Sequence, residues 1–128
     1  MKSAPNTIPS SLRTWFVIHF WADILFALPL MIAPTFTLTM FGFPVAETLT
    51  ARIVAAAFIG IGGTSLLLKN HGKETYDTLL TLKIVWSSAA MIGIILTIIE
   101  GTSPFSWAVL GIYLVFFSVW VYYKQKLR

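Results

Sequence analysis

Four long apolar runs, separated by short segments that are polar or contain proline, divide this chain. They predict helices at about 14–33, 51–68, 78–99 and 104–123. Each run holds about twenty residues, and twenty helical residues rise about 30 Å, which matches the hydrocarbon core of a bilayer. The pattern therefore predicts a single domain over residues 1–128: an all-α integral membrane protein built as a four-transmembrane-helix bundle.

The connections between these runs differ in character. Residues 35–50, TFTLTMFGFPVAETLT, are too apolar for a free loop and too few to span, so they predict a short interfacial segment between the first two helices. Residues 69–77 form the most polar run and predict a loop. Ser103 is placed to cap the fourth helix, with Pro104 at its first position. Residues 1–13 predict an irregular leader, and we expect the first helix to be retained, because signal peptides carry a shorter apolar core of roughly 7–15 residues.

The composition supports the same class. The chain is 57% hydrophobic and 11% charged, whereas soluble domains carry about 25% charged residues. The net charge of +4 does not indicate nucleic-acid binding, because the basic residues lie at the ends of the apolar runs. The absence of cysteine excludes disulfides, zinc–thiolate sites, iron–sulfur clusters and thiol nucleophiles.

The basic residues also predict the orientation of the bundle. Four spans put both termini and the 69–77 segment on one side of the membrane. Seven basic residues belong to that side: Lys2, Arg13, Lys69, Lys73, Lys124, Lys126 and Arg128. The other side holds one basic residue, Arg52, and two acidic residues, Glu47 and Glu100. By the positive-inside rule, both termini should be cytoplasmic and the protein should lie in the cytoplasmic (inner) membrane.

Three ionisable residues lie within the apolar runs, where charged groups are costly and normally face protein or water. His19 and Asp23 are four residues apart and share a helix face. Counted from the cytoplasmic edge, His19 and Lys83 both lie about 9 Å deep and Asp23 about 15 Å deep. Ser87 lies one turn beyond Lys83. We expect an Asp23–Lys83 pair with His19 beside it.

This polar cluster has three interpretations. It can be a structural pair that fixes which helices are neighbours, or a site for a ligand or a proton. In the third interpretation the residues make no contact, and Lys83 extends alone to the headgroups. The pattern leaves these three open.

Two further features concern packing. Arg52, which begins the second helix, is expected to pair with Glu47 or Glu100 at the extracytoplasmic surface. The alternative is that it binds a lipid phosphate or carboxylate. Small residues recur on one face of the second helix, at Ala56, Gly60 and Gly63, and small residues let membrane helices approach closely. We expect this face to be a helix-packing seam.

Catalytic and cofactor sites are not indicated. Ser87 and Ser88 near Lys83 resemble a Ser–Lys dyad, but no oxyanion hole accompanies them, and serines in membrane helices commonly bond back to their own backbone. His19 and His71 lie in different environments, so we expect no metal, haem or other cofactor. We therefore expect a protein that is not an enzyme.

The chain resembles a known group of proteins. The residues that carry the resemblance are HFWADILFALPLMIAP, the Phe-Gly-Phe-Pro connection, LTARIVAAAFIGIGGTSLL and LKIVWSSAA. They resemble small bacterial four-helix membrane proteins without an assigned role, a group similar to the broader DoxX-like superfamily. This resemblance implies a four-helix bundle and carries over no catalytic residue. Relatives with thiol-linked activities are not a guide, because this chain lacks cysteine.

These observations support three hypotheses about function. The first is a bundle that binds a lipid-like ligand or a membrane partner protein. The second is a small proton-coupled transporter that uses His19, Asp23 and Lys83, and so short a chain would then require a homo-oligomer. The third is an accessory, quinone-binding subunit of a membrane redox complex.

Overall fold

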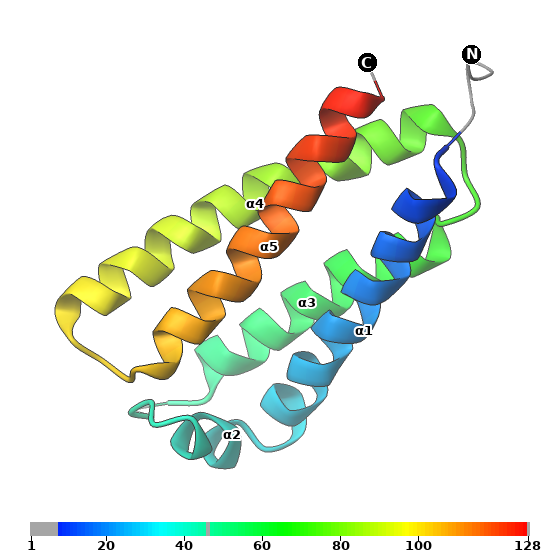
Figure 1. The fold of residues 1–128 in the computed structure, drawn as a ribbon. Coiled ribbons are helices and arrows are strands. Elements are labelled where there is room, and N and C mark those ends of the chain that lie inside the picture. Colours follow the sequence, from blue (N-terminus) through cyan, green and yellow to red (C-terminus); the bar gives the residue numbers. More distant parts are fainter. Residues whose placement is uncertain (1–7, 46, 128) are drawn as a thin grey trace.

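The computed structural model describes residues 8–45 and 47–127, and this part of the chain is helical without strands. Its elements are α1 (Ser10–Ile32), α2 (Pro34–Met40), α3 (Leu49–Leu67), α4 (Lys73–Glu100) and α5 (Phe105–Lys126) (Figure 1). The helices α1, α3, α4 and α5 are each long and apolar enough to cross a membrane. The predicted all-α architecture is confirmed.

All four long helices are longer than the apolar runs predicted, although α3 differs only slightly. α4 begins at Lys73, so the predicted 69–77 loop is largely helical, and only a short turn separates α3 from α4. Glu74 lies in the first turn of α4, and Lys124 and Lys126 lie in the last turn of α5. An acidic residue near the start of a helix and basic residues near its end interact favourably with the helix dipole. These interactions help α4 and α5 to extend into polar sequence. α1 begins at Ser10, within the predicted leader, of which residues 1–7 lie outside the described part.

The predicted interfacial segment contains the short helix α2. α1 continues through Pro29 to Ile32, and Pro34 then occupies the first turn of α2, where a proline is tolerated. Gly42 ends α2 with a φ of +83°, a left-handed conformation that favours glycine. α2 lies at the end of the molecule opposite the start of α1 and the end of α5 (Figure 1).

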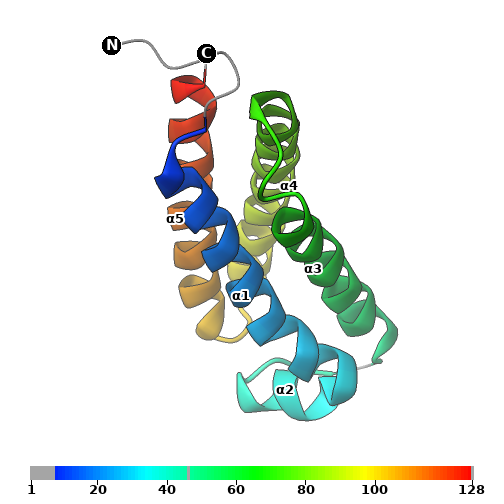
Figure 2. The ribbon, with the colours of Figure 1, turned by 90° about the vertical axis from the view of Figure 1, so that its right-hand side faces the viewer.

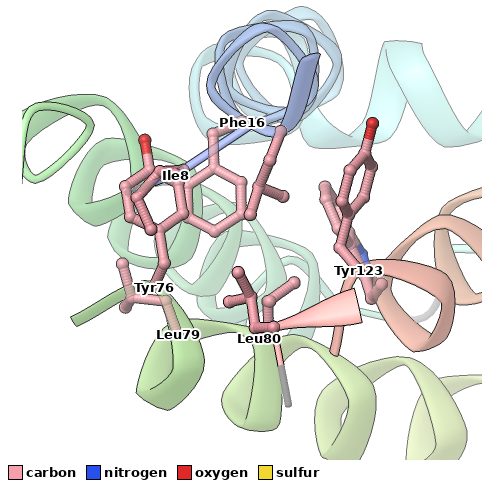
Figure 3. Packing of buried hydrophobic residues seen from close by; sticks show 9 residues of the cluster. Ile8, Phe16, Tyr76, Leu79, Leu80 and Tyr123 are labelled. Atoms are coloured by element: carbon pink, nitrogen blue, oxygen red, sulfur yellow. The ribbon is translucent and has the colours of Figure 1, made fainter. Parts of the chain in front are cut away.

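The long helices pack as two pairs, α1 with α3 and α4 with α5 (Figure 1). Figure 2 shows the same helices from the right-hand side of Figure 1. At the end opposite α2, a cluster of buried side chains joins the two pairs (Figure 3). We call it the terminal cluster; it consists of Ile8, Leu12, Phe16, Tyr76, Leu79, Leu80, Trp120, Tyr123 and Leu127. Near α2, a smaller cluster of Ala27, Leu30, Ala51 and Ala55 joins α1 to α3.

The outer surface of the bundle is apolar. Large hydrophobic side chains are exposed on every long helix, for example Leu25 (71% exposed), Leu67 (80%), Ile99 (75%) and Trp107 (64%). Water would disfavour such a surface, whereas hydrocarbon tails solvate it. The environment of this bundle is therefore a lipid bilayer.

The predicted helix-packing seam on α3 is wrong, because its residues do not make the close contact with α1. Ala56 and Gly60 are exposed, and a Cβ added at Gly60 or Gly63 would meet nothing within 4 Å. The close contact is made at Gly62, where a Cβ would lie 2.9 Å from Asp23 Oδ2 and 3.0 Å from Asp23 Cβ. The rotation of α3 about its own axis decides which small residues meet α1, and Gly62 faces α1.

Ser103 occupies the turn between α4 and α5. α5 begins at Phe105, one residue later than predicted. The Ser103 hydroxyl accepts a hydrogen bond from the Phe105 N–H (3.2 Å) and donates one to the Phe41 carbonyl (2.5 Å). One side chain therefore connects the start of α5 to the end of α2.

Candidate functional site

Three ionisable side chains form a continuous polar chain between α1 and α4. Lys83 Nζ lies 2.6 Å from His19 Nδ1, and His19 Nε2 lies 3.4 Å from Asp23 Oδ1. An ammonium group can only donate hydrogen bonds, so the Lys83 ammonium is the donor and His19 Nδ1 is the acceptor. The ring proton then lies on Nε2, facing the Asp23 carboxylate. We call this arrangement the polar relay.

The expected direct Asp23–Lys83 pair is wrong in its connectivity. Among the described residues, the only basic and acidic side chains within 4.0 Å of each other are His19 with Asp23 and Lys124 with Asp77. His19 and Lys83 lie in the same layer, so the imidazole ring occupies the space between the ammonium and the carboxylate. Ser87, one turn beyond Lys83, is also buried.

Lys83 is almost completely buried, with 1% of its surface exposed, so it does not extend to the headgroups. Its Nζ lies 4.8 Å from the centre of the Phe16 ring and 4.9 Å from the centre of the Trp120 ring. Aromatic faces attract a cation at these distances. Phe16 and Trp120 belong to the terminal cluster, which therefore covers Lys83 on the side of the termini.

A cavity of about 190 Å³ opens on the other side of the polar relay, between the two helix pairs and toward α2. Its polar lining residues are His19, Asp23, Thr37, Ser87 and Tyr113. Six phenylalanines line it: Phe26, Phe41, Phe43, Phe58, Phe105 and Phe116. A mostly apolar cavity with a few convergent polar groups is typical of a small-molecule site.

One carboxylate oxygen in this cavity wall has no partner. Asp23 Oδ2 is buried and makes no hydrogen bond within the described part of the chain. Buried polar atoms are nearly always hydrogen-bonded, since leaving one unpaired is costly. Gly62 allows Asp23 to lie this close to α3, because any larger residue would meet the carboxylate.

Aromatic side chains line the end of the cavity nearest α2. Phe41 follows α2 and stacks on Phe105 of α5, with ring centres 4.1 Å apart and planes inclined by 12°. The Ser103 hydrogen bond to the Phe41 carbonyl supports the same contact. α2 is thus attached to α5 as well as to α1.

The predicted outer-surface ion pair does not form. Arg52 donates from Nε to the Met31 carbonyl (3.0 Å) and from a terminal nitrogen to Thr48 Oγ1 (3.3 Å). The last carbonyls of a helix lack intrahelical partners and attract cations, so the end of α1 competes successfully for the guanidinium. Glu47 instead accepts from the Thr50 N–H at the start of α3, and Glu100 is exposed.

Several site residues were not apparent from the sequence. Phe16 and Trp120 surround Lys83, and Tyr113 and Gly62 complete the surroundings of Asp23. Phe16 precedes His19 by three residues and so shares its face, which was a usable signal. The contributions of α3 and α5 depend on how those helices are rotated, and no local pattern reveals that. His71 is exposed and distant from the relay in sequence.

Within residues 8–45 and 47–127, no group of three His, Cys, Asp or Glu side chains is placed to hold a metal ion. Comparisons of the chain with protein-family models, with curated proteins and with solved structures found no match. The resemblance to DoxX-like proteins therefore stays a prediction, and the site's geometry is the basis for any functional proposal.

Proposed function

We propose that this protein binds a small lipid-like molecule within the bilayer, in the cavity between the α1–α3 pair and the α4–α5 pair. The observation that carries the proposal is the combination of an apolar cavity with a carboxylate oxygen, Asp23 Oδ2, that has no partner in the described part of the chain. Empty apolar volume destabilises a fold, and so does an unpaired buried oxygen. A bound molecule with an apolar body and a polar head would relieve both costs.

A cavity-filling variant tests this proposal. Val109 lines the cavity, so Val109→Trp should occupy it, while Val115→Trp on the lipid-facing surface (56% exposed) is the matched control. Native mass spectrometry of gently extracted protein should find a small molecule on the wild type and on Val115→Trp, but not on Val109→Trp. Equal occupancy in all three would contradict binding in the cavity. A co-purifying protein without a small molecule would favour a membrane partner instead.

The polar relay supports a second candidate, a proton-coupled carrier. His19 stands between an ammonium and a carboxylate, with contacts of 2.6 and 3.4 Å, and imidazole transfers protons between its two nitrogens in this setting. Proton flux into liposomes containing the purified protein should stop in Asp23→Asn. Flux that persists in the variant, or its absence in the wild type, would remove this candidate.

We further propose that both termini are cytoplasmic and that the protein lies in the inner membrane. The support is the excess of basic residues in the segments that four spans put on the same side as both termini. The chain has no cysteine, so single cysteines can be labelled without background. A membrane-impermeant maleimide should label Thr39→Cys in intact cells and Gln125→Cys only after permeabilisation. The reverse pattern would invert the orientation.

A further inference from the structure

The class of molecule that suits the cavity follows from the atoms around Asp23. Oδ1 faces His19 Nε2 at 3.4 Å, whereas Oδ2 is buried and has no hydrogen-bond partner among residues 8–45 and 47–127. Asp23 itself is 9% exposed, and the cavity it lines is almost entirely apolar elsewhere. A carboxylate oxygen only accepts hydrogen bonds. The occupant must therefore bring a donor to Oδ2.

The charges around the cavity restrict that donor further. Lys83 already supplies one cation to the relay and is separated from the cavity side of Asp23 by His19. Apart from His19, no basic side chain among the described residues lines the cavity. A cationic head would leave an uncompensated buried charge, and an anionic head would face Asp23 directly, so both are costly. A neutral hydroxyl group donates without adding charge.

The size and lining of the cavity restrict the apolar body. At about 190 Å³, it is somewhat larger than an engineered protein cavity of about 150 Å³ that holds benzene. Phenylalanine rings on α1, α3 and α5 and beyond α2 face it, and aromatic rings pair favourably in offset or edge-to-face geometry. One aromatic ring with a short substituent matches this space.

We propose that the cavity selects a neutral aromatic ring that carries a hydroxyl group, with the O–H donating to Asp23 Oδ2. This proposal rests on the proposed function, because it specifies the ligand of the same cavity. Phenols are the simplest members of this class. The matching alkylbenzene lacks the donor, and the matching benzoate replaces it with an anion.

The test compares 4-ethylphenol, ethylbenzene and 4-ethylbenzoate by equilibrium dialysis against the protein in lipid nanodiscs. Empty nanodiscs correct for partition into lipid, and Val109→Trp corrects for binding outside the cavity. A hydrogen bond to a charged group should make 4-ethylphenol bind about tenfold or more tightly than ethylbenzene. The benzoate should show no specific binding. In Asp23→Asn, the preference for the phenol over ethylbenzene should fall to less than about threefold, since the acceptor is no longer charged.

The outcomes distinguish failure of the hydroxyl proposal from failure of the proposed function. If ethylbenzene and 4-ethylphenol bind the wild type equally, the cavity binds ligands but the hydroxyl proposal is overturned. If the benzoate binds best, the assignment of a neutral donor is wrong. A phenol preference that survives in Asp23→Asn would place the contact at another residue. If no probe binds more than it does to Val109→Trp, the proposed function itself fails. These ligand comparisons within the wild type need no variant of Asp23, so they hold even where Asp23→Asn does not fold.

Discussion

The contact between Gly62 and Asp23 gives the sharpest prediction about how the site is held. Alanine at position 62 would place its Cβ 2.9 Å from Asp23 Oδ2 and 3.0 Å from Asp23 Cβ, whereas alanine at position 63 would meet nothing within 4 Å. Both substitutions occur in the same helix, one residue apart. Their comparison therefore isolates the close approach of α1 to α3.

The magnitude follows from two opposing terms. Replacing glycine by alanine in a helix stabilises by about 0.5–1 kcal/mol, and this gain is common to both variants. Overpacking at Gly62 costs about 1–3 kcal/mol, because the Asp23 oxygen can rotate away but its Cβ moves only with α1. We expect Gly63→Ala to be neutral or stabilised, and Gly62→Ala to be less stable than Gly63→Ala by about 1–3 kcal/mol.

The assay is reversible unfolding of both variants in the same mixed micelles, together with dialysis of 4-ethylphenol. Gly62→Ala should also weaken binding, since it pushes the carboxylate out of its position, while Gly63→Ala should bind like the wild type. Equal stabilities for the two variants would refute the inferred approach of α1 to α3 at Gly62. If the two variants are equally stable, the inferred approach is refuted even when they differ in binding 4-ethylphenol.

Three further predictions concern the relay, the α2 end and the start of α3. Lys83→Met should lower the free energy of unfolding by about 3 kcal/mol, because it leaves the Asp23 carboxylate without a cation. In a double-mutant cycle measured by unfolding, adding Asp23→Asn should recover most of that loss. Additive effects of the two substitutions would contradict the coupling. Ser103→Ala should lower the unfolding free energy by about 0.5–2 kcal/mol through the lost hydrogen bonds to Phe41 and Phe105. The control, Ser106→Ala, removes a buried hydroxyl that has no partner among the residues the structure describes and should cost little. Equal costs for the two variants would contradict the role of Ser103. The Thr50 N–H holds the pKa of the Glu47 carboxyl below its usual value, so this contact stabilises the start of α3 above the ordinary pKa and is lost as pH falls through the lowered one. Carboxyl NMR titration should show that Thr50→Pro, which removes the N–H, raises this pKa, and an unchanged midpoint would count against the contact.

The sequence was most informative where a short spacing determines the geometry. The spacing of four between His19 and Asp23 predicted a shared face, and the depth of Lys83 below the polar boundary predicted its layer. All three residues are buried and belong to the polar relay. The pattern could not give the positions of these side chains within the membrane plane, since a common depth does not say that the His19 ring lies between the charges of Lys83 and Asp23. His19 therefore appeared beside the pair rather than within it.

The two wrong packing predictions have the same physical origin. A stripe of small residues identifies a face that can pack closely, but the direction of that face depends on the rotation of α3, and Gly62 rather than Gly60 or Gly63 meets α1. Arg52 was matched with acidic side chains, although its partner is the Met31 carbonyl at the end of α1. Backbone acceptors at helix ends occur in every sequence and leave no residue signature.

Photolabelling tests the central claim, occupancy of the cavity, most directly. A phenol bearing a small diazirine group, activated by light in nanodiscs, attaches to whichever residues surround it. Our account predicts adducts on cavity residues such as Phe58 and Tyr113, competition by 4-ethylphenol, and loss of these adducts in Val109→Trp but not in Val115→Trp. Adducts confined to lipid-facing residues such as Trp21 and Leu25, unchanged in Val109→Trp, would contradict a binding site between the helix pairs.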